Sequence, residues 1–309
     1  MLDHAQLTLA LLALLAIAAG AYVVARRRAR RLRIEAPRTE RLLPAAEPAV
    51  ESSEPPAPEL PAEPSNVARH PIVLAHGFMG FDAIGLGNLR EEYFRGVRAH
   101  LQARGHRVHV VRVSPIAGIR RRAEQLAEQL EALDAERVNI VAHSMGGLDA
   151  RYAISRLGVH RRVASLTTIG TPHHGTPLAD GTAYLAGFNL ALKLMDSLGA
   201  DLAGFQDLGT KRMQAFNDAV PDVDEVAYAS YSGWLPKGAS VHQLLLPTFA
   251  LLHRTVGNND GIVPADSQSW GQSLGAVAAD HWAQIGWSNG FDVKTFYEAV
   301  ALGLARRGF

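Results

Sequence analysis

A serine stands in a short motif that is typical of nucleophilic serines. Residues 142–146 read Ala-His-Ser-Met-Gly and match the pattern Gly-x-Ser-x-Gly, with alanine at the first glycine position. This motif presents the hydroxyl on a strained turn between a strand and a helix, so the flanking residues must be small. Because an apolar run precedes it and Gly146-Gly147 follows it, we predict that Ser144 is a nucleophile. The alternative is a serine that only caps the helix beginning near Met145.

A serine hydroxyl needs a base to remove its proton, and the usual base is a histidine oriented by a carboxylate. With this motif, the order along the chain is serine, acid, histidine. Of thirteen histidines only His281 lies beyond Asp260, which stands in a turn-rich stretch after the apolar run 244–252. We therefore predict His281 as the base and Asp260, at the end of a late strand, as the acid. Asp266 is the rival acid, and the simpler interpretations are an ordinary Asn-Asp-Gly turn and a surface histidine.

Acyl transfer also requires two backbone N–H groups that face the developing oxyanion. One is expected from Met145, the residue after the nucleophile. The other is expected from the glycine-flanked turn at residues 75–80, Ala-His-Gly-Phe-Met-Gly, with Phe78 as first choice and Met79 as second. The alternative for this turn is an ordinary strand ending.

We expect neither a metal nor a cofactor. His143, His173, His174 and His253 form no convincing ligand set, because neighbours such as His173 and His174 diverge on a strand. We place these histidines in loops and in contacts around the site. The absence of cysteine excludes disulfides, thiolate metal sites and a cysteine nucleophile. A net charge of +1, with the basic residues gathered in one short block, argues against nucleic acid as a partner.

The elements that must position these residues alternate between apolar strands and amphipathic helices from residue 71 onward. We predict strands at 72–75, 107–113, 138–142 and 163–169, and helices at 89–104, 119–133 and 146–157. This alternation argues for a mostly parallel sheet with helices on both faces. A chain of 309 residues, 48% of them hydrophobic, can bury such a core.

The first 69 residues differ in composition from the rest. Residues 7–25 form an uncharged apolar run long enough for a membrane-spanning helix, and six arginines follow between residues 26 and 33. A cleavable signal peptide would carry its positive charge before the apolar run, so we predict an uncleaved single-pass anchor in residues 1–35. By the positive-inside tendency, the catalytic part then lies on the cytoplasmic side. Residues 36–69, rich in Pro, Glu and Ala, are predicted to be a disordered linker.

The predicted catalytic domain, residues 70–309, contains a long insertion at about 176–210. Apolar residues recur there at intervals of three and four: Leu185, Phe188, Leu192, Met195, Leu198 and Leu202. Such a helical face could form a lid over the site, and the alternative is a core helix packed on the sheet. In either case an apolar approach to Ser144 favours acyl chains over charged substrates.

The stretch 71–82, Pro-Ile-Val-Leu-Ala-His-Gly-Phe-Met-Gly-Phe-Asp, resembles the opening of bacterial triacylglycerol lipases that fold with a dedicated chaperone. Similar stretches recur in the family's order, at 138–152, 170–176, 213–217, 228–233 and 259–263. The resemblance implies an α/β-hydrolase fold and carboxylic-ester hydrolysis. It also implies a triad of Ser144, Asp260 and His281, with an oxyanion hole from Phe78 and Met145.

The chain departs from that family in two respects. Members bind a structural calcium partly through an aspartate two residues after the histidine and a glutamine four further on, where this chain has Ala283 and Trp287. The stretch 241–247 offers no carboxylate either, so we expect no calcium, and a chelator should leave activity and melting unchanged. The anchor and linker lie outside the resemblance, so secretion with a foldase chaperone as partner does not carry over.

Together these features predict a membrane-anchored serine hydrolase that acts on carboxylic esters of lipid type. An acyltransferase or a phospholipase using the same three side chains stays open as an alternative. A catalytically idle binding protein of hydrolase fold is a further alternative, although idle relatives tend to lose the serine or the histidine and this chain keeps both.

Overall fold

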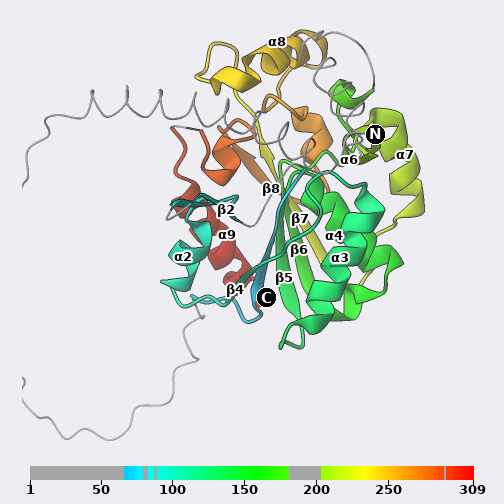
Figure 1. Ribbon diagram of the computed structural model, residues 1–309, viewed down its shortest axis with the longest axis vertical. Coiled ribbons are helices and arrows are strands. Elements are labelled where there is room, and N and C mark those ends of the chain that lie inside the picture. Colours follow the sequence, from blue (N-terminus) through cyan, green and yellow to red (C-terminus); the bar gives the residue numbers. More distant parts are fainter. Residues whose placement is uncertain (1–65, 79–82, 87–88, 181–202, 289) are drawn as a thin grey trace, which may run out of the picture. The chain divides into compact units, whose positions relative to one another are not determined.

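The computed structural model describes residues 66–309 apart from 79–82, 87–88, 181–202 and 289. Their main feature is a six-stranded sheet in the order β4-β1-β5-β6-β7-β8, in which all neighbouring strands are parallel (Figure 1). The strands are β1 Ile72–Ala75, β4 Val108–Val110, β5 Val138–His143, β6 Val163–Ile169, β7 Ala227–Gly233 and β8 Gln272–Val277. A separate antiparallel pair consists of β2 Ala83–Leu86 and β3 Leu89–Glu92.

Helices cover both faces of this sheet. Helices α3 and α4 lie on one face and α2 and α9 on the other (Figure 1). The described α-helices are α2 Val97–Gln102, α3 Ile119–Ala132, α4 Met145–Arg156, α6 Ala203–Asp207, α7 Thr210–Ala219, α8 Leu246–Thr255 and α9 Val293–Arg306. The short 3-10 helices are η1 Val159–Arg162, η2 Pro177–Ala179, η3 Gln243–Leu245, η4 Ala265–Gln268 and η5 Ala283–Ile285. The prediction of a mostly parallel sheet between two layers of helices is confirmed.

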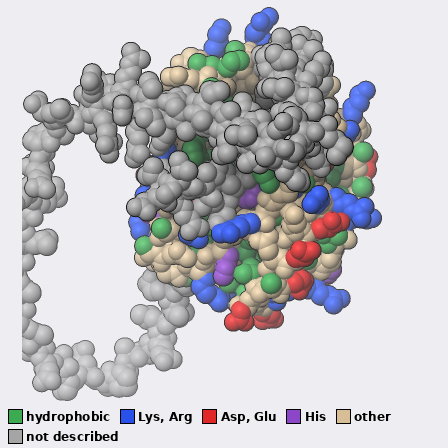
Figure 2. Space-filling view, in the orientation of Figure 1, with side chains coloured by type: hydrophobic (Ala, Val, Ile, Leu, Met, Phe, Trp, Pro, Cys, Tyr) green, Lys and Arg blue, Asp and Glu red, His purple; other side chains and the backbone are tan. Residues whose placement is uncertain are grey.

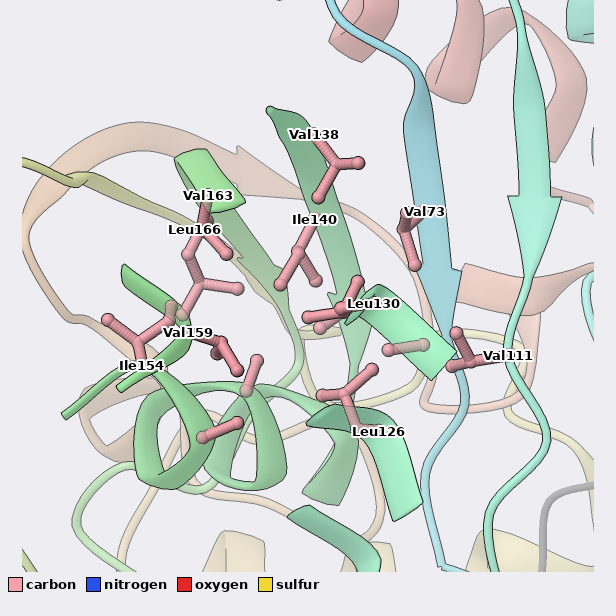
Figure 3. Packing of buried hydrophobic residues seen from close by; sticks show 14 of the residues in the cluster. Val73, Val111, Leu126, Leu130, Val138, Ile140, Ile154, Val159, Val163 and Leu166 are labelled. Atoms are coloured by element: carbon pink, nitrogen blue, oxygen red, sulfur yellow. The ribbon is translucent and has the colours of Figure 1, made fainter. Parts of the chain in front are cut away.

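The alternation of side chains along each strand divides the core between the two faces. On β1, Val73 and Ala75 belong to the cluster under α3 and α4, whereas Ile72 and Leu74 belong to the cluster under α2 and α9. Successive side chains of a strand point to opposite faces, so a strand covered on both sides must be apolar throughout. Figure 3 shows the first cluster, with strand residues meeting helix residues such as Leu126, Leu130 and Ile154.

The direction of the chain through the sheet reverses at β1. From β1 the chain moves outward to the edge strand β4 and then returns to β5, on the other side of β1. Loops that leave the carboxyl ends of two such strands diverge, and ligand sites of open parallel sheets lie between them. Residues 76–78 follow β1 and Ser144 follows β5. The topology therefore places the predicted oxyanion turn beside the predicted nucleophile.

Two predicted elements were wrong in type. Residues 89–92, expected to begin a helix, form β3, and helix α2 starts only after Gly96, whose φ of 67° lies in the left-handed region. The apolar run 244–252, interpreted as a late strand, forms η3 and most of α8. A short continuous apolar run does not distinguish a strand from a buried helix. Asp260 therefore follows a helix rather than a strand.

The predicted anchor, most of the linker and the periodic part of the predicted lid, 185–202, lie outside the described residues. Among the residues that are described, no helix is both long enough and apolar enough to cross a bilayer. The end of the predicted linker is attached to the folded part, because Arg69 N donates to Phe309 O (2.6 Å) and Ala68 N donates to His106 Nδ1 (3.2 Å).

Basic and acidic side chains both occur on the face of the molecule drawn in Figure 2. This mixture agrees with the net charge of +1.

Candidate active site

Ser144 occupies the tight turn between β5 and α4. Its backbone has φ 55° and ψ −133°, and within the described residues it is the one non-glycine residue with positive φ. Such a conformation is strained and persists only where the surrounding structure fixes it. Here Ser144 N donates to Ile169 O (2.9 Å), and Thr171 Oγ1 donates to Ser144 O (2.7 Å). These bonds hold the turn that the motif predicts, with the Ser144 side chain at the carboxyl edge of the sheet.

Small residues around Ser144 allow the neighbouring segments to approach closely. A Cβ atom added at Gly146 would lie 2.6 Å from the Ala75 carbonyl oxygen, and one added at Gly77 would lie 2.7 Å from Ser144 Cβ. Both positions therefore require glycine. Ala142, which replaces the first glycine of the motif, is fully buried, so its methyl group is accommodated.

The three predicted side chains are hydrogen bonded in series. Ser144 Oγ lies 2.9 Å from His281 Nε2, and His281 Nδ1 lies 2.7 Å from Asp260 Oδ2. Ser144 is 5% exposed, His281 6% and Asp260 0%. Because a carboxylate only accepts, Nδ1 of His281 carries the proton and Nε2 is left to accept the Ser144 hydroxyl proton. This arrangement can withdraw a proton from Ser144 as the hydroxyl attacks an electrophile.

Asp260 is held by four donors. Oδ2 accepts from His281 and from Gln284 Nε2 (3.0 Å), and Oδ1 accepts from the two peptide N–H groups of residues 262–263 (2.9 and 2.7 Å). A buried charge needs such compensation, since an unpaired carboxylate inside a protein is costly. The rival acid, Asp266, is exposed on η4, and among the described residues it makes no hydrogen bond to His281. The geometry thus favours Asp260.

The turn after β1 lies directly beside the Ser144 side chain. A Cβ atom added at Gly77 would come within 3.1 Å of Ser144 Oγ, and Gly77 N donates to Tyr93 Oη (3.2 Å). The next peptide N–H belongs to Phe78. In the described part of the chain, neither this N–H nor that of Met145 donates to a protein acceptor. Two unpaired backbone donors near one hydroxyl are suited to bind an oxyanion. Met79, the second choice, lies outside the described residues.

A buried ion pair, which the sequence patterns did not reveal, holds this turn in place. Arg122 on α3 donates from Nε to Asp149 Oδ2 on α4 (2.8 Å), and its Nη2 donates to His76 O (2.8 Å) and Gly77 O (3.3 Å). Burial raises the pKa of Asp149 to about 6, and the charge and hydrogen bond of Arg122 oppose this rise. The sequence feature that could have revealed this pair is Arg122 itself, a charged residue within the apolar face of the helix predicted at 119–133.

Replacing Arg122 by Met is expected to lower the free energy of unfolding by about 3–5 kcal/mol, because Asp149 becomes an uncompensated buried charge. The double variant Arg122→Met/Asp149→Leu should recover much of this stability. It should not recover ester hydrolysis, since the carbonyls of His76 and Gly77 still lack their donor. Denaturant unfolding and hydrolysis rates measure the two effects. A double variant that regains both would show that the ion pair does not hold the turn.

His143 and Tyr93 form a second buried contact beside the site. His143 lies on β5, not in a loop as expected, and its Nδ1 is 2.8 Å from Tyr93 Oη. Its ring centroid is 4.5 Å from that of His281. Burial, together with the neighbouring His281, lowers the pKa of His143 well below its usual value. His143 is therefore a neutral contact beside His281 rather than a competing base.

The other histidines considered as metal ligands lie away from one another or pack against other side chains. His173 and His174 lie in the loop after β6, as expected, whereas His253 lies on helix α8 rather than in a loop. Burial lowers the pKa of His173 well below its usual value, and the charge of Arg151 adds to this effect. Among the described residues, no group of three or more His, Asp or Glu side chains is placed to hold a metal ion.

Asp280 joins two segments next to the site by hydrogen bonds. Its Oδ2 accepts from His242 N and Ser288 Oγ (both 2.9 Å), and its Oδ1 accepts from the peptide N–H groups of residues 282–283 (3.0 and 2.7 Å). The loop that carries His281 is thereby tied to residues 241–247. These are the two segments in which the resemblance led us to look for calcium ligands. Sequence reasoning missed Asp280 because it weighed only the family's ligand positions.

Comparisons with known proteins extend these observations. Residues 43–226 match the family model described as a domain of unknown function (DUF7379). Triacylglycerol lipase 2 of Saccharomyces cerevisiae is 30% identical over 78% of this chain and 93% of its own length. Triacylglycerol lipase of Pseudomonas fragi is 30% identical over 67% of this chain and 84% of its own length. The solved structure of a metagenomic carboxyl esterase has the same fold, with a TM-score of 0.67 at 20% identity over 81% of this chain and 79% of its own.

Proposed function

The chain belongs to the triacylglycerol lipase family, and residues 43–226 place it in the DUF7379 family, so it is a carboxylic-ester hydrolase. We propose that it cleaves lipid-type esters through an acyl-enzyme formed on Ser144. The observation that carries the proposed mechanism is the buried series of bonds from Ser144 Oγ through His281 to Asp260, of 2.9 and 2.7 Å.

In the proposed reaction, Ser144 Oγ attacks the carbonyl carbon of the ester while its proton passes to His281 Nε2. Asp260 stabilises the resulting imidazolium, and the N–H groups of Phe78 and Met145 stabilise the oxyanion. The imidazolium then protonates the departing alkoxide, which leaves as an alcohol. Water, deprotonated by His281, attacks the acyl-enzyme, and the acid product leaves as Ser144 regains its proton.

The substrate class is supported by the apolar surroundings of the oxyanion turn. Ile119, Met145, Leu148, Leu208 and Met213 form a buried cluster, against which the Phe78 side chain packs. The Phe78 ring also lies 6.1 Å from that of Phe205 on α6. Apolar side chains next to the proposed oxyanion donors suit an acyl chain better than a charged substrate. We therefore propose fatty acyl esters, with triacylglycerol as the first substrate to test.

The test is hydrolysis of nitrophenyl esters of graded acyl length, followed by emulsified triacylglycerol. We expect kcat/KM to rise from acetyl to medium or long acyl chains, and fatty acid to be released from triacylglycerol. A sharp preference for acetyl would contradict a lipid substrate. Preferential formation of a new ester when an alcohol is added would instead indicate an acyltransferase, and release of fatty acid from phospholipid alone would indicate a phospholipase.

We also propose that residues 1–35 anchor the chain in a membrane, with the catalytic domain on the cytoplasmic side and residues 36–69 as a spacer. The support is the apolar run 7–25 and the six arginines that follow it. In sealed vesicles with the cytoplasmic face inside, added protease should spare the domain. Digestion of the domain in intact vesicles would reverse the orientation, and recovery of the full-length chain without membranes would contradict the anchor.

We further propose that the insertion at 176–210 acts as a lid, on the support of its apolar periodicity. Replacing Leu192 and Met195 by serine should then reduce hydrolysis of emulsified long-chain esters more than that of dissolved short-chain esters. Equal loss on both substrates, together with a lower melting temperature, would favour the alternative of a core helix.

A further inference from the structure

Gln284 has an unusual position for an uncharged polar side chain. It lies on η5, three residues after His281, and is 0% exposed. Its Nε2 donates to Asp260 Oδ2 at 3.0 Å, the same oxygen that accepts from His281. Among the described residues its Oε1 has no hydrogen-bond partner. The amide has two polar neighbours: it donates to Asp260, and it also interacts with the side chain of His143, where it opposes the lowering of the His143 pKa by burial.

Two glycines at strand ends make the space that the Gln284 amide occupies. A Cβ atom added at Gly170, just after β6, would collide with Gln284 Oε1, and one added at Gly233, the last residue of β7, would collide with Gln284 Nε2. Gly170 has φ 60°, which also favours glycine, but Gly233 has no such conformational requirement. At Gly233 the need for glycine is therefore steric, and it comes mainly from Gln284, with the Ala279 carbonyl oxygen 3.2 Å from such a Cβ atom as a weaker restriction.

The backbone on this side of the amide is fixed as well. Gly233 N donates to Gln268 Oε1 (2.6 Å), and Gln268 Nε2 donates to Gly233 O (2.9 Å) and to Val263 O (3.1 Å). Val263 is one of the two residues whose N–H groups bind Asp260 Oδ1. The Gln268 side chain thus connects Gly233, which borders the Gln284 amide, with Val263 in the loop that holds Asp260. This connection limits how far either segment can move.

We propose that Gln284 is a positioning residue for the proposed reaction: its amide, held between Gly170 and Gly233, fixes the rotation of the Asp260 carboxylate so that Oδ2 faces His281 Nδ1. This inference rests on the proposed function of Ser144, His281 and Asp260. Because a carboxylate accepts only, the NH₂ end of the amide must face it, which gives the side chain one orientation. Gln284 has no role in proton transfer and does not touch the reacting atoms.

The ionisable groups that face the pair of Asp260 and His281 come from several elements. His143 on β5 lies against the His281 ring and is kept neutral by burial, and Tyr93 is bonded to His143. Asp280, next to His281 in the chain, has both carboxylate oxygens engaged by four donors. Replacing Gln284 by an uncharged residue changes the interactions of Asp260 and of His143 but adds no charge to this set of side chains.

The first test is Gln284→Met, which keeps the volume and removes the donor. We expect kcat to fall by on the order of tenfold to a hundredfold, with KM little changed, because one hydrogen bond to a charged group is lost. The acid side of the pH profile of kcat/KM should shift to higher pH, since Asp260 with fewer donors interacts more strongly with the His281 imidazolium. An unmoved pH profile would overturn the proposal, whether or not kcat falls, because packing alone would not shift it.

A second pair of variants tests the slot. Gly233→Ala should lower kcat by a similar factor, because its methyl group displaces the Gln284 amide. In a Gln284→Ala background the same Gly233→Ala change should have no further effect on kcat, since the amide is gone. Independent, multiplicative losses would show that Gly233 does not act through Gln284. Melting temperatures of all variants show which of them are folded.

Failure of this inference and failure of the proposed function give different results. If Gln284→Met keeps the natural rate and pH profile while Ser144→Ala is inactive, the positioning role is wrong and the nucleophile stands. If Ser144→Ala retains activity, the proposed mechanism is wrong and the positioning role falls with it.

Discussion

Ser144→Ala is expected to lower ester hydrolysis by about 10⁴-fold or more and to abolish covalent labelling by a fluorophosphonate probe. Without Oγ no acyl-enzyme can form, and His281 has no hydroxyl to deprotonate. The strained backbone at φ 55° is tolerated by alanine no worse than by serine, so the fold should persist. Initial rates with a nitrophenyl ester and gel fluorescence after labelling measure the two effects.

The matched control is Ser155→Ala, because Ser155 lies on the same helix α4 and is only partly buried. This variant should label and hydrolyse like the natural chain. Undiminished labelling of Ser144→Ala, or loss of labelling in Ser155→Ala alone, would contradict the proposed nucleophile. A natural chain that does not label would remove the acyl-enzyme mechanism altogether.

Asp260→Asn should lower kcat by about 10³- to 10⁴-fold while leaving KM and the melting temperature much less affected. An asparagine amide can turn its NH₂ group toward His281 Nδ1, which would then have to accept a proton rather than donate one. The imidazole proton would move to Nε2, the atom that must receive the Ser144 proton, and the base would be blocked. Steady-state kinetics at several pH values and thermal melting measure these quantities.

Asp266→Asn is the control for this second change, since Asp266 is the rival acid of the sequence interpretation and is exposed on η4. Its activity should equal that of the natural chain. If instead Asp266→Asn were the inactive variant and Asp260→Asn the active one, the acid would have been assigned to the wrong carboxylate.

The elements around Ser144 could be predicted because their signals are local. The strand at 163–169 has the predicted bounds, the strand before Ser144 ends one residue later than predicted, and the helix after it begins and ends one residue earlier. A strand buried on both faces must be apolar throughout, and that property can be read from a few adjacent residues. The same reasoning failed at 244–252, because a buried helix can carry the same apolar run.

The candidate residues Ser144, Asp260 and His281 could be chosen from motif and chain order alone. That their side chains lie within hydrogen-bond distance of one another could not be predicted in this way. Ser144 and His281 are 137 positions apart, and their 2.9 Å contact depends on the order of strands β5, β6, β7 and β8 in the sheet. The roles of Arg122 and Gln284 were not predicted at all. Each is a polar residue whose partners come from distant segments, and periodicity carries no information on such partners.

The sequence by itself therefore determined the alternation of strands and helices, the motif that exposes a serine hydroxyl, and the short set of residues able to assist it. Only the tertiary structure decided which carboxylate faces His281, what holds the turn after β1, and why Gly233 has no side chain. The physical reason is that secondary structure follows from neighbours along the chain, whereas the burial and pairing of polar groups depend on segments that meet only when the sheet is complete.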